Sequence, residues 1–318
     1  MIITLTANPS LDRTVTLPTE LVPGGVHRIS ADTTDPGGKG INVALGVARA
    51  GLEVLALFPA APGDHLLELL DGLGLSHRET PTSGKVRTNL TVLSQPGVTT
   101  KINEPGSRLD AEQVEAIEHL LVAEVDPGDI VMLSGSLAPG VPQDEYARLV
   151  RLLRAQGAWV GVDTSDAPLL ALAAAAPEGA PDFLKPNAEE LGQLTGADGA
   201  LLERQARLGE YASVRDAARD LHDSGVGDVL VTLGGAGAVL VTGEGAWYAP
   251  SPDAPVVSTV GAGDSAVAGY LIAKSSGFDA PERLALAVAY GAVAVSLPGT
   301  TIPARTDVHE DVSTVVEL

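Results

Sequence analysis

The sequence lacks cysteine altogether and has few aromatic residues, since Phe, Trp and Tyr together make up 3% of its 318 positions. Without cysteine the chain has no disulfide bond, no iron–sulfur cluster and no thiol nucleophile. No apolar run approaches the length of a membrane span, and the first residues contain neither a basic segment nor an apolar stretch of signal length. We therefore expect a cytoplasmic protein without a membrane partner, although the lack of cysteine does not itself fix the compartment.

Positive charge is also scarce, because 20 Lys and Arg stand against 41 Asp and Glu, which gives a formal net charge of −21. Nucleic acids and anionic membranes bind basic surfaces, so we expect neither as the main partner. The six histidines never fall at the spacing of metal ligands. If the protein binds an anion, its few cations must be gathered locally, and several of them do stand beside glycine-rich turns.

What is present is the composition of an ordinary globular protein, 45% hydrophobic and long enough to bury a large core. From about residue 110 onward, apolar runs of strand length alternate with helical patterns, which predicts an α/β fold with a mostly parallel sheet and helices on both faces. Residues 10–34 and 84–106 consist of short alternating pieces, and we expect them to form a small β-sheet lid. The prediction is one domain over residues 1–318, with this lid attached.

The strongest chemical signal lies in residues 258–269. Gly261 and Gly263 let the backbone turn closely around a ligand, and Asp264 then begins an Ala-rich helical pattern. The free N–H groups of a helix start carry partial positive charge, which suits a phosphoryl group in transfer. A carboxylate beside them could take the proton from an attacking hydroxyl. The alternative is that Asp264 only caps the helix.

A second glycine-rich helix start is the Gly-Gly-Lys-Gly sequence of residues 37–40, which a 3.6-residue apolar pattern follows. It is not a Walker A loop, because no glycine stands five residues before Gly38 and Gly40 replaces the Ser or Thr that would hold magnesium. The alternative is a tight strand-to-helix turn. Three glycines and one lysine in four residues are nevertheless hard to explain by packing alone.

Polar residues follow several of the predicted strands, namely Ser136, Asp163, Lys185 and Asn187. The carboxyl ends of parallel strands are where ligands bind in α/β sheets. Asp12 follows the first predicted strand in the same way and could hold a substrate hydroxyl, although the local sequence favours an Asx turn.

The glycine-rich turn at residues 234–237 is similar to part of a dinucleotide-binding fingerprint. The final glycine of that fingerprint would fall at Leu240, and residues 238–242 continue as a strand, so the turn belongs to a hairpin. A dinucleotide-dependent oxidoreductase is therefore disfavoured.

Three motifs together resemble the ribokinase-like carbohydrate kinases of the phosphofructokinase B type. They are Gly-Gly-Lys-Gly-Ile-Asn from residue 37, Lys-Pro-Asn-x-x-Glu at 185–190 and Gly-Ala-Gly-Asp at 261–264. Their order and spacing extend over nearly the whole chain. Further stretches look like the branch of 1-phosphofructokinases, minor 6-phosphofructokinases and tagatose-6-phosphate kinases: residues 8–12, 87–89 and 258–260. Residues 100–106, Thr-Lys-Ile-Asn-Glu-Pro-Gly, look most like bacterial 1-phosphofructokinases.

The resemblance implies an ATP-dependent kinase that phosphorylates a hexose phosphate, with fructose 1-phosphate as the expected acceptor and Mg²⁺ as the metal. The backbone of Gly261, Ala262 and Gly263 would form the anion hole, and Asp264 would deprotonate the sugar hydroxyl. The implied nucleotide-binding residues are Lys185, Asn187, Thr232, Gly234 and Gly237, and Glu190 would steer the magnesium.

The resemblance also implies a sugar-phosphate site made of Asp12, Arg28, Gly38, Lys39, Asn42, Arg87, Asn89, Asn103 and Ser136. Within this set the guanidinium groups of Arg28 and Arg87 would clamp the existing phosphate. In this family the lid often packs against the lid of a second copy, so a homodimer is implied, in which Arg28 could serve the neighbouring active site.

Other acceptors and another function class stay open. A tagatose-6-phosphate kinase or a minor-type 6-phosphofructokinase would share these motifs. Val26 stands where some 6-phosphofructokinase relatives carry a phosphate-binding lysine, which weakens the second of these readings. A non-catalytic sensor of sugar phosphate or nucleotide on the same fold is the alternative from a different class.

Overall fold

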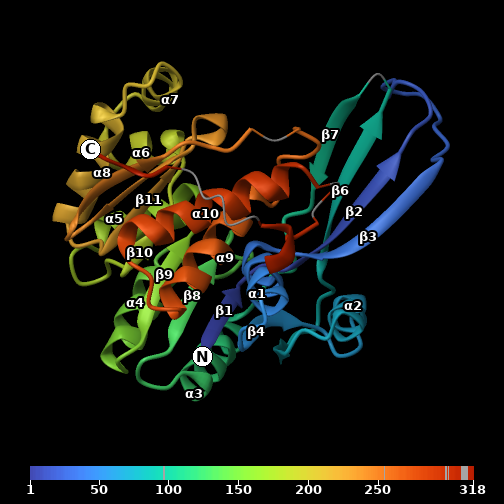
Figure 1. Ribbon diagram of the computed structural model, residues 1–318. Helices are drawn as coiled ribbons and strands as arrows, with labels where there is room; N and C mark the ends of the chain where they lie inside the picture. The colour runs from blue at the N-terminus through green and yellow to red at the C-terminus, as the bar shows by residue number, and fades with distance from the viewer. Residues whose placement is uncertain (96, 254, 298, 300, 309–313) are drawn as a thin grey trace.

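The computed structural model describes residues 1–95, 97–253, 255–297, 299, 301–308 and 314–318. Within these residues a central sheet of ten strands runs through the molecule (Figure 1). Its strands follow the order β14 (Val316–Glu317), β13 (Gly245–Ala249), β12 (Ala238–Thr242), β11 (Asp228–Thr232), β10 (Phe183–Leu184), β9 (Trp159–Asp163), β8 (Ile130–Ser134), β1 (Ile2–Thr6), β4 (Val54–Ala60) and β5 (His77–Pro81). The seven strands from β11 to β5 are parallel, and β12, β13 and β14 each pair antiparallel with the preceding strand of the chain.

Helices cover both faces of this sheet because the central strands are apolar on both sides. In β1, for example, Ile3 and Leu5 belong to one buried core and Ile2 to the other. Helices that pack into the first core are α3 (Ala111–Glu124), α4 (Glu145–Ala155), α5 (Asp166–Ala174), α6 (Ala188–Thr195), α7 (Gly199–Arg207) and α8 (Ala212–Asp223). Helices that pack into the second are α1 (Lys39–Arg49), α2 (His65–Leu73), α9 (Ala262–Ser275) and α10 (Ala280–Val295).

A separate four-stranded sheet projects from one side of this body (Figure 1). Its order is β3 (Ala31–Gly37), β2 (Ser10–Thr16), β6 (Arg87–Ser94) and β7 (Val98–Asn103). The β2–β3 and β6–β7 pairs are antiparallel, whereas β2 and β6 run parallel. We call these four strands the lid sheet.

The register of the lid sheet aligns polar residues from three strands. Asp12 on β2 lies opposite Asn89 on β6, and Asn89 lies opposite Asn103 on β7. Directly paired residues point to the same face of a sheet, so these three side chains share one face. Asp12 is part of a strand, and its carboxylate accepts hydrogen bonds from Ser10 Oγ at 2.8 Å and Asn89 Nδ2 at 3.0 Å. The Asx-turn interpretation of Asp12 is therefore wrong.

The short helices at residues 234–236 and 305–307 are 3₁₀ turns. Among the described residues, none of the helices combines the length and the apolar character that crossing a bilayer demands.

Candidate active site

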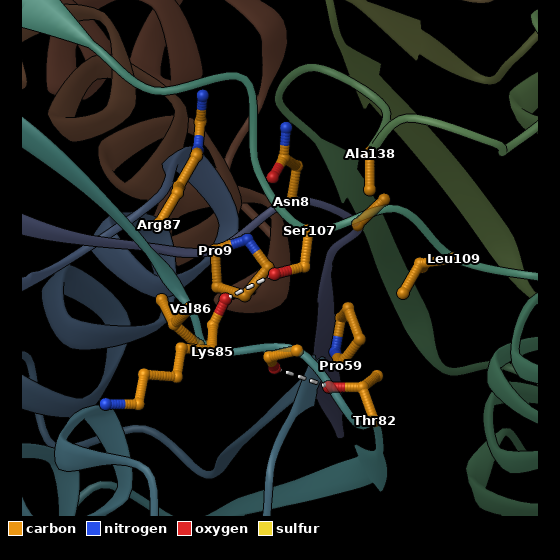
Figure 2. A pocket seen from close by; sticks show the side chains of 12 residues that line it. Asn8, Pro9, Pro59, Thr82, Lys85, Val86, Arg87, Ser107, Leu109 and Ala138 are labelled. Carbon is orange, nitrogen blue, oxygen red and sulfur yellow. Dashed lines mark hydrogen bonds between the residues drawn. The ribbon is translucent and has the colours of Figure 1, made fainter.

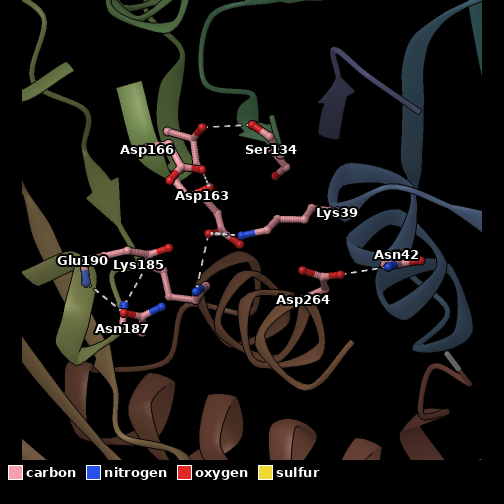
Figure 3. Close-up of polar contacts among 12 residues, drawn as sticks. Lys39, Asn42, Ser134, Asp163, Asp166, Lys185, Asn187, Glu190 and Asp264 are labelled. Atoms are coloured by element: carbon pink, nitrogen blue, oxygen red, sulfur yellow. Dashed lines mark hydrogen bonds and ion pairs between the residues drawn. The ribbon is translucent and has the colours of Figure 1, made fainter. Parts of the chain in front are cut away.

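The site forms where the carboxyl ends of the central strands meet the first turns of α1 and α9. These two helices pack against each other in the second core. Figure 3 shows that Lys39 and Lys185 converge on Asp163, while Asp264 faces Asn42. Residues that are far apart in the sequence thus form one polar centre.

Helix α9 begins at Ala262 with its N-terminus open. Gly261 precedes it with a φ of 79°, a left-handed conformation that favours glycine, and no side chain caps this end of the helix. The first N–H groups of a helix have no partner within the helix. These N–H groups of α9 therefore have no intrahelical partner, and the predicted anion hole at this position stays a prediction.

Asp264 is buried and does not cap α9. Its Oδ2 accepts a hydrogen bond of 2.8 Å from Nδ2 of Asn42 on α1. Burial and, to a smaller extent, the Asp163 carboxylate raise the pKa of Asp264 to about 6, against the opposing effects of Lys39, the bond from Asn42 and Lys185. The capping interpretation is wrong, and the carboxyl is poised to exchange a proton near neutral pH.

Asp163, at the end of β9, is the fully buried counter-ion of two lysines. Its Oδ1 lies 2.9 Å from Nζ of Lys39 and 3.4 Å from Nζ of Lys185. Burial alone would raise the pKa of Asp163, but the two ammonium groups outweigh this effect and lower it. Burial would likewise lower the pKa of Lys39, but Asp163 and Asp264 outweigh it and raise it. Asp163 thus pairs with both lysines beside the start of α9, and Lys39 is held positive there.

The glycines of α1 have a packing role that the sequence did not reveal. Gly38 has a φ of 112°, and a Cβ at Gly40 would lie 2.8 Å from the carbonyl oxygen of Leu5 on β1. Only glycine allows this helix start to approach β1 so closely. Packing thus accounts for these glycines, contrary to our expectation, and the close approach carries Lys39 and Asn42 to the centre.

A cavity of about 410 Å³ adjoins the start of α9, where Ala262 and Gly263 line it. Small and apolar residues of α9 and α10 form much of its wall, which also includes Thr232, Gly234, Gly237 and Gly263. Such a volume suits a small-molecule ligand. The Nζ atom of Lys185 lies 3.6 Å from where a Cβ at Gly263 would stand, so this lysine lies beside the wall of the cavity.

Asn187 and Glu190 form a capping box at the start of α6. Asn187 Oδ1 accepts a 2.8 Å hydrogen bond from the Glu190 backbone, and Glu190 Oε2 accepts one of 2.9 Å from the Asn187 backbone. The backbone of Asn187 also forms a bridge with Thr232. The box leaves the Asn187 amide nitrogen and Glu190 Oε1 able to meet a ligand.

Only some of the residues that we predicted to bind the sugar phosphate lie close to one another in the structure. Arg87 donates a 3.1 Å hydrogen bond to the Glu104 carbonyl, and its buried Nε has no partner among the described residues. Ser136 is exposed in the loop after β8. Arg28 is exposed in the segment between β2 and β3, and the described residues offer it no hydrogen bond or ion pair. Arg28 therefore contacts none of the residues of the centre within the described part of this single chain.

The sequence did not reveal the partners of Asp163. It indicated Asp163 only as a polar residue at a strand end, because the pairing with Lys39 joins positions 124 apart. Its place at the carboxyl end of a parallel strand is the signal that singled it out.

Comparison with known proteins identifies the family. The model of the pfkB family carbohydrate kinases matches residues 6–307. The chain belongs to this family.

Relatives of known name agree with this assignment. The chain is 38% identical to the 1-phosphofructokinase of Rhodobacter capsulatus, over 95% of this chain and 92% of that one. It is 34% identical to ATP-dependent 6-phosphofructokinase isozyme 2 of Escherichia coli, over 97% of both chains. The crystal structure of phosphofructokinase-2 from Escherichia coli in complex with substrates and products superimposes with a TM-score of 0.87, at 32% identity over 96% of both chains.

The predicted family and the predicted ribokinase-like α/β fold are thus confirmed. The protein is a carbohydrate kinase, a phosphotransferase that acts on an alcohol group, and its family implies ATP as the donor. Among the described residues no three His, Cys, Asp or Glu side chains are grouped to hold a metal ion.

Proposed function

We propose that this pfkB kinase is a 1-phosphofructokinase, which transfers the γ-phosphoryl group of ATP to fructose 1-phosphate and gives fructose 1,6-bisphosphate. The observation that carries the proposal is Asp264, a buried carboxyl with a pKa of about 6 at an open helix start, between a nucleotide-sized cavity and the lid sheet. Similarity to 1-phosphofructokinases over most of the chain supports the choice of acceptor.

The roles of the residues follow from phosphoryl transfer, which depends mainly on positioning and charge stabilisation. Asp264 takes the proton of the sugar hydroxyl as that oxygen attacks the γ-phosphorus. The N–H groups of Gly261, Ala262 and Gly263 meet the charge that builds on the transferred group. Lys39 and Lys185, which both pair with Asp163, add positive charge at this centre.

The nucleotide and the sugar phosphate take opposite sides of this centre. Thr232, Gly234 and Gly237 line the cavity for the nucleoside, with Lys185 and Asn187 toward its phosphates. Asp12, Asn89 and Asn103 share the face of the lid sheet that holds the sugar, together with Gly38, Asn42 and Ser136. Arg87 clamps the existing phosphate, and its buried, unpartnered Nε supports this role.

A magnesium ion fits the donor set of this site. Mg²⁺ keeps several waters and binds through one or two carboxylates together with substrate phosphates, so it needs no all-protein cage. Asp163 Oδ2 is buried without a partner among the described residues, and Glu190 Oε1 is not used by the capping box. These two carboxylates would hold the ion, which would neutralise charge on the ATP phosphates.

The same proposal includes one domain, residues 1–318, whose lid sheet joins a second copy in a homodimer with Arg28 reaching the neighbouring site. Exposed apolar side chains on and beside the lid sheet support such a contact: Val22, Val26, Ile29, Val98 and Ile102. A cytoplasmic location completes the proposal, because ATP and hexose phosphates are made there.

Initial rates with ATP test the acceptor against the two open alternatives. Fructose 1-phosphate should give a higher kcat/KM than fructose 6-phosphate or tagatose 6-phosphate. The 6-phosphate alternative has its own support, since the chain is 34% identical to a 6-phosphofructokinase isozyme. A kcat/KM about tenfold higher for either 6-phosphate, worth about 1.4 kcal/mol of transition-state stabilisation, would reassign the acceptor.

A further inference from the structure

Asn8 lies at the junction between the body and the lid sheet, in the connection from β1 to β2 (Figure 2). Its side chain is buried. The amide nitrogen Nδ2 donates a hydrogen bond of 3.1 Å to the carbonyl of Pro105, which lies in the segment that returns from the lid sheet to the body. The same nitrogen lies 3.4 Å from Ser136 Oγ and 3.5 Å from the carbonyl oxygen of Leu137, in the loop after β8.

The other side of this amide is closely packed. Gly106 follows Pro105 with a φ of 96°, and a Cβ at this position would collide with Oδ1 of Asn8. The returning segment therefore passes directly over the amide, which leaves no space for a side chain larger than that of glycine. One amide thus fixes three stretches of chain against each other: its own, residues 105–106 and residues 136–137.

Each of the three stretches carries part of the proposed sugar-phosphate site. The chain that contains Asn8 continues into Asp12. Residue Glu104, next to Pro105, accepts a 2.8 Å hydrogen bond from the Thr88 backbone through its carboxylate, and its carbonyl accepts from Arg87. The third stretch contains Ser136.

We propose that Asn8 is a positioning residue for the sugar phosphate, which aligns the lid-borne groups with the body-borne loop. This inference rests on the proposed function. In this proposal Asn8 does not contact the substrate and acts only by holding these three segments in place. Its amide suits the task because Nδ2 donates into a set of oxygen acceptors that an acceptor-only group could not satisfy.

Replacement of Asn8 by Asp keeps the shape and removes the donor. The carboxylate would place negative charge against three oxygen atoms in a buried position, which drives the segments apart. We expect the KM for fructose 1-phosphate to rise at least about tenfold, whereas the KM for ATP and the kcat stay within about twofold. Initial-rate kinetics with each substrate varied in turn measure this split.

Thr82→Val is the matched control. Thr82 is buried and, like Asn8, lines a small cavity at this junction (Figure 2). Among the described residues its hydroxyl donates only to the carbonyl of Gly84, at 3.1 Å, in the connection between β5 and β6. It contacts none of the three segments through a hydrogen bond. Both Michaelis constants of this variant should stay within about twofold of the wild-type values.

If Asn8→Asp does not fold, Asn8→Ser shortens the donor without adding charge and should show the same split to a smaller extent. An unchanged KM for fructose 1-phosphate in a folded Asn8 variant, or an equal rise in the KM for ATP, would overturn the positioning role. Assays of the wild-type enzyme distinguish a failure of the proposed function from a failure of the proposed role of Asn8. Absence of activity of the wild type toward any hexose phosphate would refute the proposed function instead, and calorimetric titration of sugar phosphate into wild type and variant would then test Asn8 alone.

Discussion

The N-termini of α1 and α9 are both rich in glycine, but the glycines have different roles in the two helices. At the start of α1, Gly40 lies so close to β1 that a Cβ would stand 2.8 Å from a backbone carbonyl oxygen. At the start of α9, a Cβ on Gly261 or Gly263 would meet only ordinary contacts, at 3.7 Å and 3.6 Å from the nearest atoms. The N-terminus of α1 is thus closely packed against β1, whereas the N-terminus of α9 has space for a ligand.

This contrast assigns separate tasks to the two helices. The tight start of α1 delivers Lys39 and Asn42 to fixed positions, and the open start of α9 presents N–H groups and Asp264. Asp163 connects the two, because it binds Lys39 of α1 and also Lys185, which borders Gly263 of α9. Substitutions at the N-terminus of α1 should therefore affect mainly stability, and those at the N-terminus of α9 mainly turnover.

The largest expected effect is the loss of turnover when Asp264, the proposed base at the N-terminus of α9, is replaced. Asp264→Asn keeps the shape and the hydrogen bond from Asn42 but cannot accept a proton, so kcat should fall by about 10²–10⁴-fold. ADP binding, measured by calorimetry, should change little because the cavity is untouched. Activity near the wild-type level would remove Asp264 as the base and would favour the sensor alternative.

The next largest effect, on stability, should come from replacing Asp163, whose ion pairs connect the N-termini of α1 and α9. Asp163→Asn leaves the buried ammonium group of Lys185 and the partly buried one of Lys39 without their counter-ion, which we expect to cost about 3 kcal/mol of unfolding free energy. Denaturant unfolding of wild type and variant at equal ionic strength measures this loss. An exposed carboxylate in an ion pair, Asp32 with Arg13 at 3.0 Å, is the control, since Asp32→Asn should change stability by no more than about 1 kcal/mol.

Asp264 should also reduce the stability of the fold at neutral pH. Its pKa rises from 3.8 to about 6 on folding, so the native state binds the proton more tightly than the unfolded chain. The resulting penalty is absent below the unfolded pKa, grows through this interval and is complete above the folded pKa. Asp264→Asn should therefore raise the unfolding free energy by about 3 kcal/mol at about pH 8, and the gain should shrink toward about pH 5.

The same titration governs turnover in the wild type. Because the base must be deprotonated, kcat should decline as the pH falls through about 6. A pH–rate profile with a limb in this region would agree with the unfolding data. A flat profile across it, together with no pH-dependent gain from Asp264→Asn, would contradict the raised pKa.

Much of the fold was predictable because it depends on local patterns. Alternating apolar runs and helical periods from residue 110 onward indicated the parallel sheet. The helical patterns at residues 110–124, 143–155 and 213–224 agree with the observed helices α3, α4 and α8 to within two residues at each end. The elements without a prediction include β5, α6, α7, β13 and β14. Of these, β5 and β14 are the edge strands of the central sheet. For example, β5 has the polar sequence His-Arg-Glu-Thr-Pro and pairs only with β4.

The site was less predictable, because its contacts join distant positions. Motifs indicated Lys39, Lys185 and Asp264 as separate residues, but the bond from Asn42 to Asp264 spans 222 positions. Local sequence also misjudged Asp12, which looked like a turn residue and is held within β2 by pairing with β6. Tertiary strand pairing decided its conformation, and one chain read in isolation cannot supply that pairing.

The smallest expected effects test the contrast between the two helix starts directly. Gly40→Ala adds a methyl group against the backbone of β1 and should lower the unfolding free energy by about 1–3 kcal/mol through overpacking. Gly263→Ala meets no such obstacle, and alanine in a helix should add about 0.5–1 kcal/mol of stability. Its methyl group nevertheless stands beside Lys185, where the transferred phosphoryl group is proposed to lie, so kcat should fall although the fold is more stable. Denaturant unfolding and initial rates on both variants measure the contrast: equal losses of stability would show that the two starts are packed alike, and an unchanged kcat in Gly263→Ala would mean that the phosphoryl group passes elsewhere.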